Sequence, residues 1–332
     1  MKKLIAAAVA TSVSAIAFAD VSITGNANYE YFHKEDSGIN TNYGDTEINL
    51  SVKGKTGDTA VVANFEVTDH GQTATAAAFD VEDTYMTTKI GDVNLKMGNF
   101  ASGTTALGGE IDQGSRSTNK VSATTKIGGA TIGYHVASES GTDVYNTDGA
   151  AITAAMNIGG VDVSIKEQSD SYTLMGVKGS AAGVNYRVES WDSDTSNSDV
   201  LFYEVGTKLG DVNVSYAAID ADTTGLVTEG DSSIFAQEMA VDSTSAGKTG
   251  VDGVSQVTLS TSVDGTALKL RVGELRGAST YKDASFSRIE ASRTLASGAK
   301  LTVSYDDYED TGVTTGAMSD TQLLEVDLSV NF

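Results

Sequence analysis

Polar and apolar residues alternate one by one along much of this chain, and this period of two constrains the fold more than any other feature. The pattern is clearest in residues 323–332, which read LLEVDLSVNF. Successive side chains of a β-strand point to opposite faces of the sheet, so this segment has one apolar and one polar face. Residues 46–53 and 212–217 repeat the pattern. The sequence therefore predicts an all-β protein. The apolar face of the last segment carries Leu324, Val326, Leu328, Val330 and Phe332.

Pairs of turn residues separate the alternating segments. Four of these turns are nearly copies of one another, and each places two small or acidic residues between strand-like runs. Two-residue turns join antiparallel strands tightly, and glycine supplies the positive φ that they need. Residues 263–266 have the same form, and looser turns are expected at 54–58, 179–183 and 296–298. The four similar turns are Ile90–Val93, Ile127–Ala130, Ile158–Val161 and Leu209–Val212.

Longer polar connections alternate with these tight turns, among them residues 33–44, 100–118 and 220–251. Short turns on one side of a membrane and longer loops on the other are the layout of an outer-membrane barrel. Eight tight turns and nine longer connections give eighteen strands, with sixteen as the close alternative. An even number puts both ends of the chain on the periplasmic side. We therefore expect a transmembrane, antiparallel, up-and-down β-barrel of 16–18 strands.

The first residues predict export. Met1-Lys2-Lys3 precede an apolar run over residues 4–16, and Ala17-Phe18-Ala19 follows as a small-residue cleavage site. These are the parts of a secretory signal, and the run is too short to span a hydrocarbon core of about 30 Å. We expect residues 1–19 to be a signal peptide and residues 20–332 to form one outer-membrane barrel domain.

Composition excludes several kinds of function. The chain has 45 acidic residues against 22 lysines and arginines, a net charge of −23, which argues against nucleic acid as a partner. It has no cysteine, and therefore no disulfide or thiolate ligand. It also has no proline, which cannot donate to the ladder of a central strand. After the leader, no segment approaches 18 consecutive apolar residues, so a membrane-crossing form of this chain would be a closed barrel.

Three features together resemble the Gram-negative general porin family. They are the leader, the alternating last strand that ends in Phe332, and residues 91–119, which read GDVNLKMGNFASGTTALGGEIDQGSRSTN. That stretch is similar to the family's fifth strand and third loop, which folds into the barrel and narrows it. The glycines before Glu110 and Asp112 resemble the acidic tip of that loop. A count of eighteen strands would depart from the family's sixteen.

The resemblance implies a function, partners and a location, but no cofactor. The family forms homotrimers of barrels in the outer membrane, surrounded by lipid and lipopolysaccharide, and small hydrophilic solutes and ions diffuse passively through them. The outer-membrane assembly machinery inserts such barrels after recognising a terminal strand with an aromatic last residue, a position that Phe332 holds here.

Physical reasoning adds a candidate site in the lumen. A barrel of this size is too wide for side chains to fill, so its polar face lines water. We expect a constriction in which acids of the third loop face a basic wall of lumen lysines, with Arg116 on one side or the other. Opposed charges across a narrow pore create a transverse field that orients dipolar solutes and sets selectivity. The expected constriction residues are Glu110, Asp112, Arg116, Lys53, Lys96 and Lys120.

An enzyme is disfavoured, and two other functions stay open. The three histidines show no metal-ligand spacing, and no G-x-S-x-G element occurs. A secreted or surface β-rich adhesin or structural protein would share the leader and the turns, yet would not need an apolar face on nearly every strand. A substrate-specific outer-membrane channel would carry aromatic residues along its lumen, and only Trp191 and Phe202 stand out as isolated candidates.

Overall fold

The computed structural model describes residues 20–36, 39–70, 78–101, 116–136, 150–169, 172–194, 199–222, 251–277, 284–310 and 321–332. Eighteen β-strands run through these ranges. No helix within them is long and apolar enough to cross a membrane. In chain order the strands are β1 (Asp20–Asp36), β2 (Ile39–Thr56), β3 (Thr59–His70), β4 (Ala78–Ile90), β5 (Val93–Ala101), β6 (Arg116–Ile127), β7 (Ala130–Val136), β8 (Ala151–Ile158), β9 (Val161–Gln168), β10 (Tyr172–Ala181), β11 (Val184–Ser193), β12 (Val200–Leu209), β13 (Val212–Ala221), β14 (Val251–Val263), β15 (Thr266–Gly277), β16 (Ala284–Thr294), β17 (Lys300–Asp310) and β18 (Thr321–Asn331).

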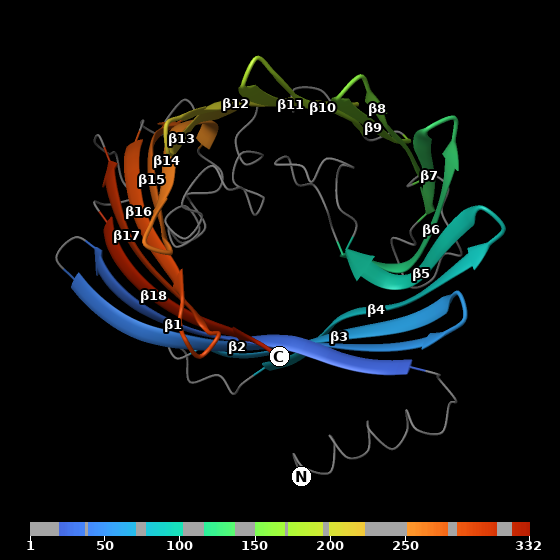
Figure 1. Ribbon diagram of the computed structural model, residues 1–332, viewed down its shortest axis with the longest axis horizontal. Helices are drawn as coiled ribbons and strands as arrows, with labels where there is room; N and C mark the ends of the chain where they lie inside the picture. Colours follow the sequence, from blue (N-terminus) through green and yellow to red (C-terminus); the bar gives the residue numbers. More distant parts are fainter. Residues whose placement is uncertain are drawn as a thin grey trace, which may run out of the picture.

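The strands form one closed barrel (Figure 1). Each strand pairs with the next along the chain, and β1 also pairs antiparallel with β18. At this seam Asn26 lies opposite Asn331, and Gly25 and Phe332 exchange two backbone hydrogen bonds of 2.9 Å. The predicted antiparallel up-and-down barrel is therefore confirmed, and the strand count is eighteen.

The predicted tight turns are confirmed, and glycine explains their geometry. The first residue of each of the four similar turns has a φ between 58° and 61°. Residues other than glycine rarely adopt this left-handed conformation, which a two-residue turn between antiparallel strands requires. These first residues are Gly91, Gly128, Gly159 and Gly210.

The loop predicted over residues 33–44 is wrong. Strand β1 continues to Asp36 and β2 begins at Ile39, so only a very short connection separates them. The polar side chains of this region suggested a loop, but they hydrogen-bond across the ladder: the Tyr31 hydroxyl donates to Asn42 Oδ1 at 3.0 Å. The His33 ring also contacts Asn42 Oδ1, through Nδ1 at 2.6 Å. Both strands thus exceed the roughly 9–11 residues that cross a bilayer.

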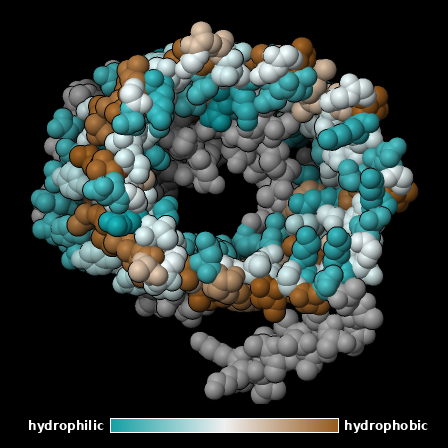
Figure 2. Space-filling model, viewed as in Figure 1, coloured by the Kyte–Doolittle hydropathy of each residue, from teal (hydrophilic) through white to brown (hydrophobic). Residues whose placement is uncertain are grey.

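The alternation separates an apolar outer face from a polar lumen. Figure 2 shows the ring of strands hollowed at its centre, with apolar residues along its outer wall. Large apolar side chains on this face are widely exposed, which suits contact with lipid rather than water. Among the most exposed are Ile23, Ile90, Ile127, Leu209 and Phe332.

A β-bulge in β4 changes which side chains face the lumen. Asn64 of β3 lies opposite Asp83, but the next residue, Phe65, lies opposite Val81, so Glu82 is an extra residue in the ladder. On the near side of the bulge, Asp83 shares the lumen face with Asn64, its hydrogen-bond partner at 3.2 Å. Beyond the bulge, Val81 faces outward and is 54% exposed. An extra residue of this kind re-aims side chains locally.

Candidate functional site: the barrel lumen

Lysines from three strands form a basic wall, which we define as Lys96 of β5, Lys120 of β6 and Lys166 of β9. The Lys96 Nζ lies 4.1 Å from the centre of the Phe100 ring, and the Lys120 Nζ lies 5.2 Å from the same centre. Lys120 is only 5% exposed, and it has no ion pair or hydrogen bond within the described part of the chain. Lys166 donates to the Tyr172 hydroxyl at 2.5 Å. The contacts of Lys96 and Lys120 with the Phe100 ring offset only a small part of the free energy lost when an ammonium leaves water.

His135 of β7 lies between two of these lysines. Its Nδ1 and the Ser122 hydroxyl are 2.8 Å apart, and its Nε2 and the Thr153 hydroxyl are 3.0 Å apart. Both Lys120 and Lys166 act on the ring electrostatically. The imidazole is thus fixed by hydroxyl groups of the neighbouring strands, and it joins the lysines into one continuous polar surface.

Carboxylates gather on another part of the lumen, which we call the acidic wall: Glu30 of β1, Glu47 of β2, Glu66 of β3 and Asp327 of β18. Glu30 lies opposite Asp327 in the ladder between β1 and β18. Glu47 and Asp327 both act on Glu30 electrostatically, as does Glu325. The two walls lie on different strands of the ring, β18 to β3 and β5 to β9, so charge is distributed unevenly around the lumen.

A third part of the lumen carries cations and anions in contact, and we call it the paired wall. Arg288 of β16 bonds Asp306 of β17 through Nη1 at 3.1 Å, and Glu325 of β18 through Nη2 at 3.1 Å. Arg271 of β15 lies 3.4 Å from Glu290 of β16. Asp306 is fully buried and Arg288 is 8% exposed. Buried charges need such partners, because removal from water is costly for each ion alone.

The structure brings two of the predicted constriction residues together and places a third apart from them. Lys96 and Lys120 face the lumen, as predicted, and meet around Phe100. Lys53 also faces the lumen, but Val62, Tyr85 and Gly98 lie between it and Lys120 along the hydrogen-bonded row. Arg116 is the first residue of β6. Glu110, Asp112, the rest of the predicted third loop over residues 102–115 and the predicted signal peptide over residues 1–19 lie outside the described residues.

Sequence reasoning missed Lys166, although its signal was present. Residues 161–166 read VDVSIK, so Lys166 shares a face with Asp162 and Ser164, opposite the apolar residues. The alternation of these six residues is enough to place Lys166 on the polar face.

Trp191 and Phe202 are not isolated, contrary to the prediction. The rings of Trp191 and Tyr172 have centroids 5.6 Å apart, and the Arg187 guanidinium lies 4.7 Å from the centre of the Phe202 ring. Leu174 lies opposite Trp191 and is 1% exposed. These aromatic rings and Leu174 share the lumen face of β10 to β12, where they are buried, so this part of the lumen face is aromatic and apolar.

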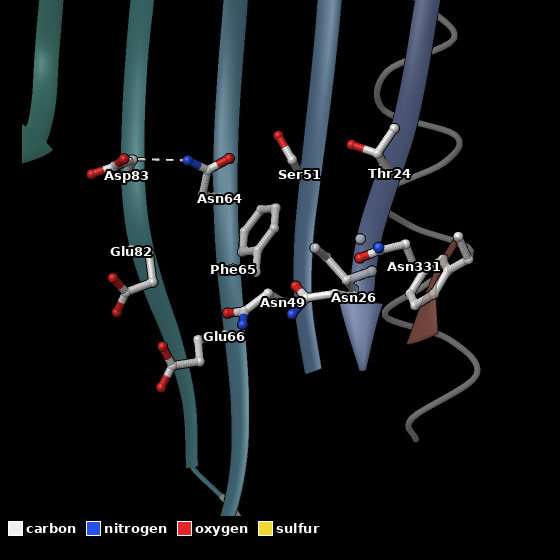
Figure 3. Close-up of a pocket in the computed structure, with 13 residues that line it drawn as sticks. Thr24, Asn26, Asn49, Ser51, Asn64, Phe65, Glu66, Glu82, Asp83 and Asn331 are labelled. Carbon is white, nitrogen blue, oxygen red and sulfur yellow. Dashed lines mark hydrogen bonds between the residues drawn. The ribbon is translucent and has the colours of Figure 1, made fainter. Parts of the chain in front are cut away.

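A recess of about 750 Å³ opens on the lumen next to the seam (Figure 3). Residues of β1, β2, β3, β4 and β18 line it. Figure 3 shows Asn64 reaching Asp83, with the carboxylates of Glu66 and Glu82 together at one side. Its polar lining consists of amides, hydroxyls and carboxylates: Thr24, Asn26, Asn49, Ser51, Asn64, Glu66, Glu82, Asp83 and Asn331.

Comparison with known proteins identifies the fold. No family model and no curated protein sequence matches this chain. Solved structures do match over nearly the whole length. OccK2 (OpdF) of Pseudomonas aeruginosa aligns with a TM-score of 0.68 at 9% identity, covering 95% of this chain and 98% of that one. OccAB3 of Acinetobacter baumannii gives 0.63 at 10% identity, covering 95% and 99%.

The outer membrane protein opdK of Pseudomonas aeruginosa gives a TM-score of 0.63 at 9% identity, covering 95% of this chain and 99% of that one. At these identities the likeness concerns the fold alone. The chain therefore has the fold of Gram-negative outer-membrane channel barrels, and its lumen residues must be interpreted from its own geometry.

Proposed function

We propose that this protein is an outer-membrane porin of a Gram-negative bacterium, a water-filled channel for passive diffusion of small hydrophilic solutes and ions, and not an enzyme. The observation that carries this proposal is a closed ring of eighteen strands with an apolar exterior and a charged, hollow interior. A barrel of this size holds water, and only closed barrels and helices satisfy every backbone group in lipid.

Selectivity then comes from charges that line the passage. We propose a constriction between the acids Glu110 and Asp112 and a wall that includes Lys53, Lys96 and Lys120. Lys166 extends that wall to β9, and the acidic wall supplies a second source of negative charge from the strands themselves. Separated charges of opposite sign orient a dipolar solute as it passes and hinder an apolar one.

Conductance of the purified, folded protein in a planar lipid bilayer tests this function. With a salt gradient across the bilayer, we expect stepwise openings and a reversal potential whose sign reports which wall governs the ions. Steps in groups of three support the homotrimer that the family resemblance implies, and single steps support a monomer. Folded, inserted protein that never conducts contradicts the porin function and favours a surface structural role.

A substrate-specific channel is the second candidate, and the polar recess of about 750 Å³ beside the seam favours it. One of the similar structures is OccK2 (OpdF) in complex with glucuronate, which shows that this fold accommodates a bound solute. Solute flux into proteoliposomes separates the candidates. Flux that saturates with concentration supports a specific channel, and flux that stays proportional to concentration supports general diffusion.

The apolar exterior of the barrel indicates that lipid surrounds it. We place it among outer-membrane lipid and lipopolysaccharide, inserted by the outer-membrane assembly machinery through its last strand. Phe332 supports this assignment because its ring is on the outer face, 59% exposed, where a partner can reach it. Insertion assays with Phe332→Ser test the assembly signal, and we expect slower insertion with unchanged conductance once the barrel is inserted.

A further inference from the structure

We propose that the recess beside the seam is a binding subsite for small polyhydroxylated solutes of neutral or positive charge. This inference rests on the proposed channel function, since the solute reaches the recess through the lumen. The volume of about 750 Å³ lies within the roughly 300–1,000 Å³ range of small-molecule sites.

A row of polar side chains gives the recess its pattern. In the ladder, Glu66 lies opposite Asn49, Asn49 opposite Asn26, and Asn26 opposite Asn331. Neighbouring strands are about 4.8 Å apart, so the row presents one polar group per strand at regular intervals. A flat, regularly spaced row of this kind suits a ligand with several hydroxyl groups around a ring.

Hydrogen bonds within the wall fix how the asparagines face the recess. The Asn64 amide donates to Asp83 at 3.2 Å, and the Asn49 amide donates to Glu47. Each donation orients the side chain and leaves its carbonyl oxygen as an acceptor. Among the described residues, Glu66 has no hydrogen-bond or ion-pair partner. The recess therefore offers mostly acceptors, and hydroxyl groups are the natural donors to fill them.

The carboxylates around the recess determine which charge a bound solute can carry. Glu66, Glu82 and Asp83 line the recess, and Glu47 lies beside it. Of these acids, Asp83 lies within electrostatic reach of Lys96 in the basic wall. A carboxylate-bearing sugar is repelled here, whereas an ammonium group is attracted to the acid side of the recess. We therefore expect an amino sugar to bind more tightly than a neutral sugar, and a sugar acid to bind least.

Saturation-transfer NMR on the folded barrel in detergent tests the order of affinity with three probes: glucosamine, glucose and glucuronate. We expect transfer to glucosamine and glucose, and glucosamine to bind roughly three- to tenfold more tightly, as one added charged hydrogen bond predicts. Glucuronate that binds as tightly as glucosamine overturns the inference, as does an absence of transfer to both of the other sugars.

Variants locate the site. Glu66→Gln should reduce the advantage of glucosamine over glucose, because it removes the negative charge and keeps a carbonyl acceptor. Asn49→Ala should weaken both sugars about equally. Asn185→Ala is the matched control, because Asn185 is a lumen asparagine of β11 outside the recess. A loss in the control equal to the loss in Asn49→Ala overturns the assignment. Circular dichroism and heat-dependent gel mobility confirm that each variant is folded.

The same samples separate this inference from the proposed function. A barrel that conducts ions but binds neither glucose nor glucosamine overturns the subsite and leaves the channel standing. A barrel that binds the sugars but never conducts supports the subsite and contradicts the channel. Binding is measured without conduction, so each result decides one question.

Discussion

The basic wall and the paired wall both place buried cations in the lumen, but they compensate them differently. Arg288 meets two carboxylates at 3.1 Å, and Arg271 meets Glu290. Lys120 is about as buried, yet it lies against the Phe100 ring and within electrostatic reach of two other lysines. A charge neutralised by its neighbours presents little field to a passing ion. We infer that the paired wall stabilises the barrel, whereas the basic wall acts on solutes.

Removing the guanidinium from the paired wall should have the largest effect on stability. Arg288→Met leaves the fully buried Asp306 without its cation, and breaking such a pair typically costs about 3–5 kcal/mol. Urea unfolding of the barrel in lipid vesicles, followed by Trp191 fluorescence, measures the change. The double variant Arg288→Met with Asp306→Asn should recover part of the loss. An unchanged unfolding midpoint in the single variant contradicts the inference that the paired wall stabilises the barrel.

Removing a charge from the basic wall should change ion selectivity and leave stability nearly unchanged. Lys120→Met leaves no carboxylate of the described residues without a cation, and it removes an ammonium that is only 5% exposed, so we expect a change in stability within about 1 kcal/mol. The reversal potential should shift toward cation preference, because the field at the wall becomes less positive. Destabilisation as large as that of Arg288→Met would show that Lys120 supports the fold instead.

Charge-reversal variants should change the reversal potential more, the closer the lysine lies to the proposed constriction. Lys96→Glu should change the reversal potential more than Lys53→Glu, because Lys96 shares the Phe100 contact with Lys120 and Lys53 does not. Bilayer recordings in a salt gradient give both values. Unchanged ion selectivity in both variants would eliminate the proposed constriction.

The smallest effect is expected where an ion pair is exposed. Arg276 and Asp220 form a close pair, but their side chains are 54% and 60% exposed. Such pairs contribute about 0–1 kcal/mol, and salt screens them. Arg276→Ala should therefore shift the urea midpoint slightly at low salt and not at high salt. A loss of stability that persists at high salt would mean that this exposed ion pair stabilises the barrel in the same way as the buried pairs.

The strands and their faces were predictable because alternation and turn chemistry are local. The alternation within residues 161–166 alone predicts which side chains face the lumen, and the glycine of each tight turn alone predicts that turn. The pairing of Arg288 with Asp306 and Glu325 was not predictable, because it depends on the register of three strands. The bulge at Glu82 reverses the facing of β4 without a marker in the sequence. The loop prediction over residues 33–44 was wrong because polar side chains there hydrogen-bond across the strand ladder rather than to water.

The seam between β1 and β18 has a consequence for how the protein folds. Every other ladder joins strands that are neighbours along the chain, whereas this one joins the first strand to the last. Closing it costs the largest loop entropy and comes with the highest contact order of any pairing in the barrel. Until it closes, β1 and β18 expose unpaired backbone edges, which are templates for aggregation. We therefore expect closure of this seam to be a late step in folding, and the hydrogen bonds between Gly25 and Phe332 mark where that step ends.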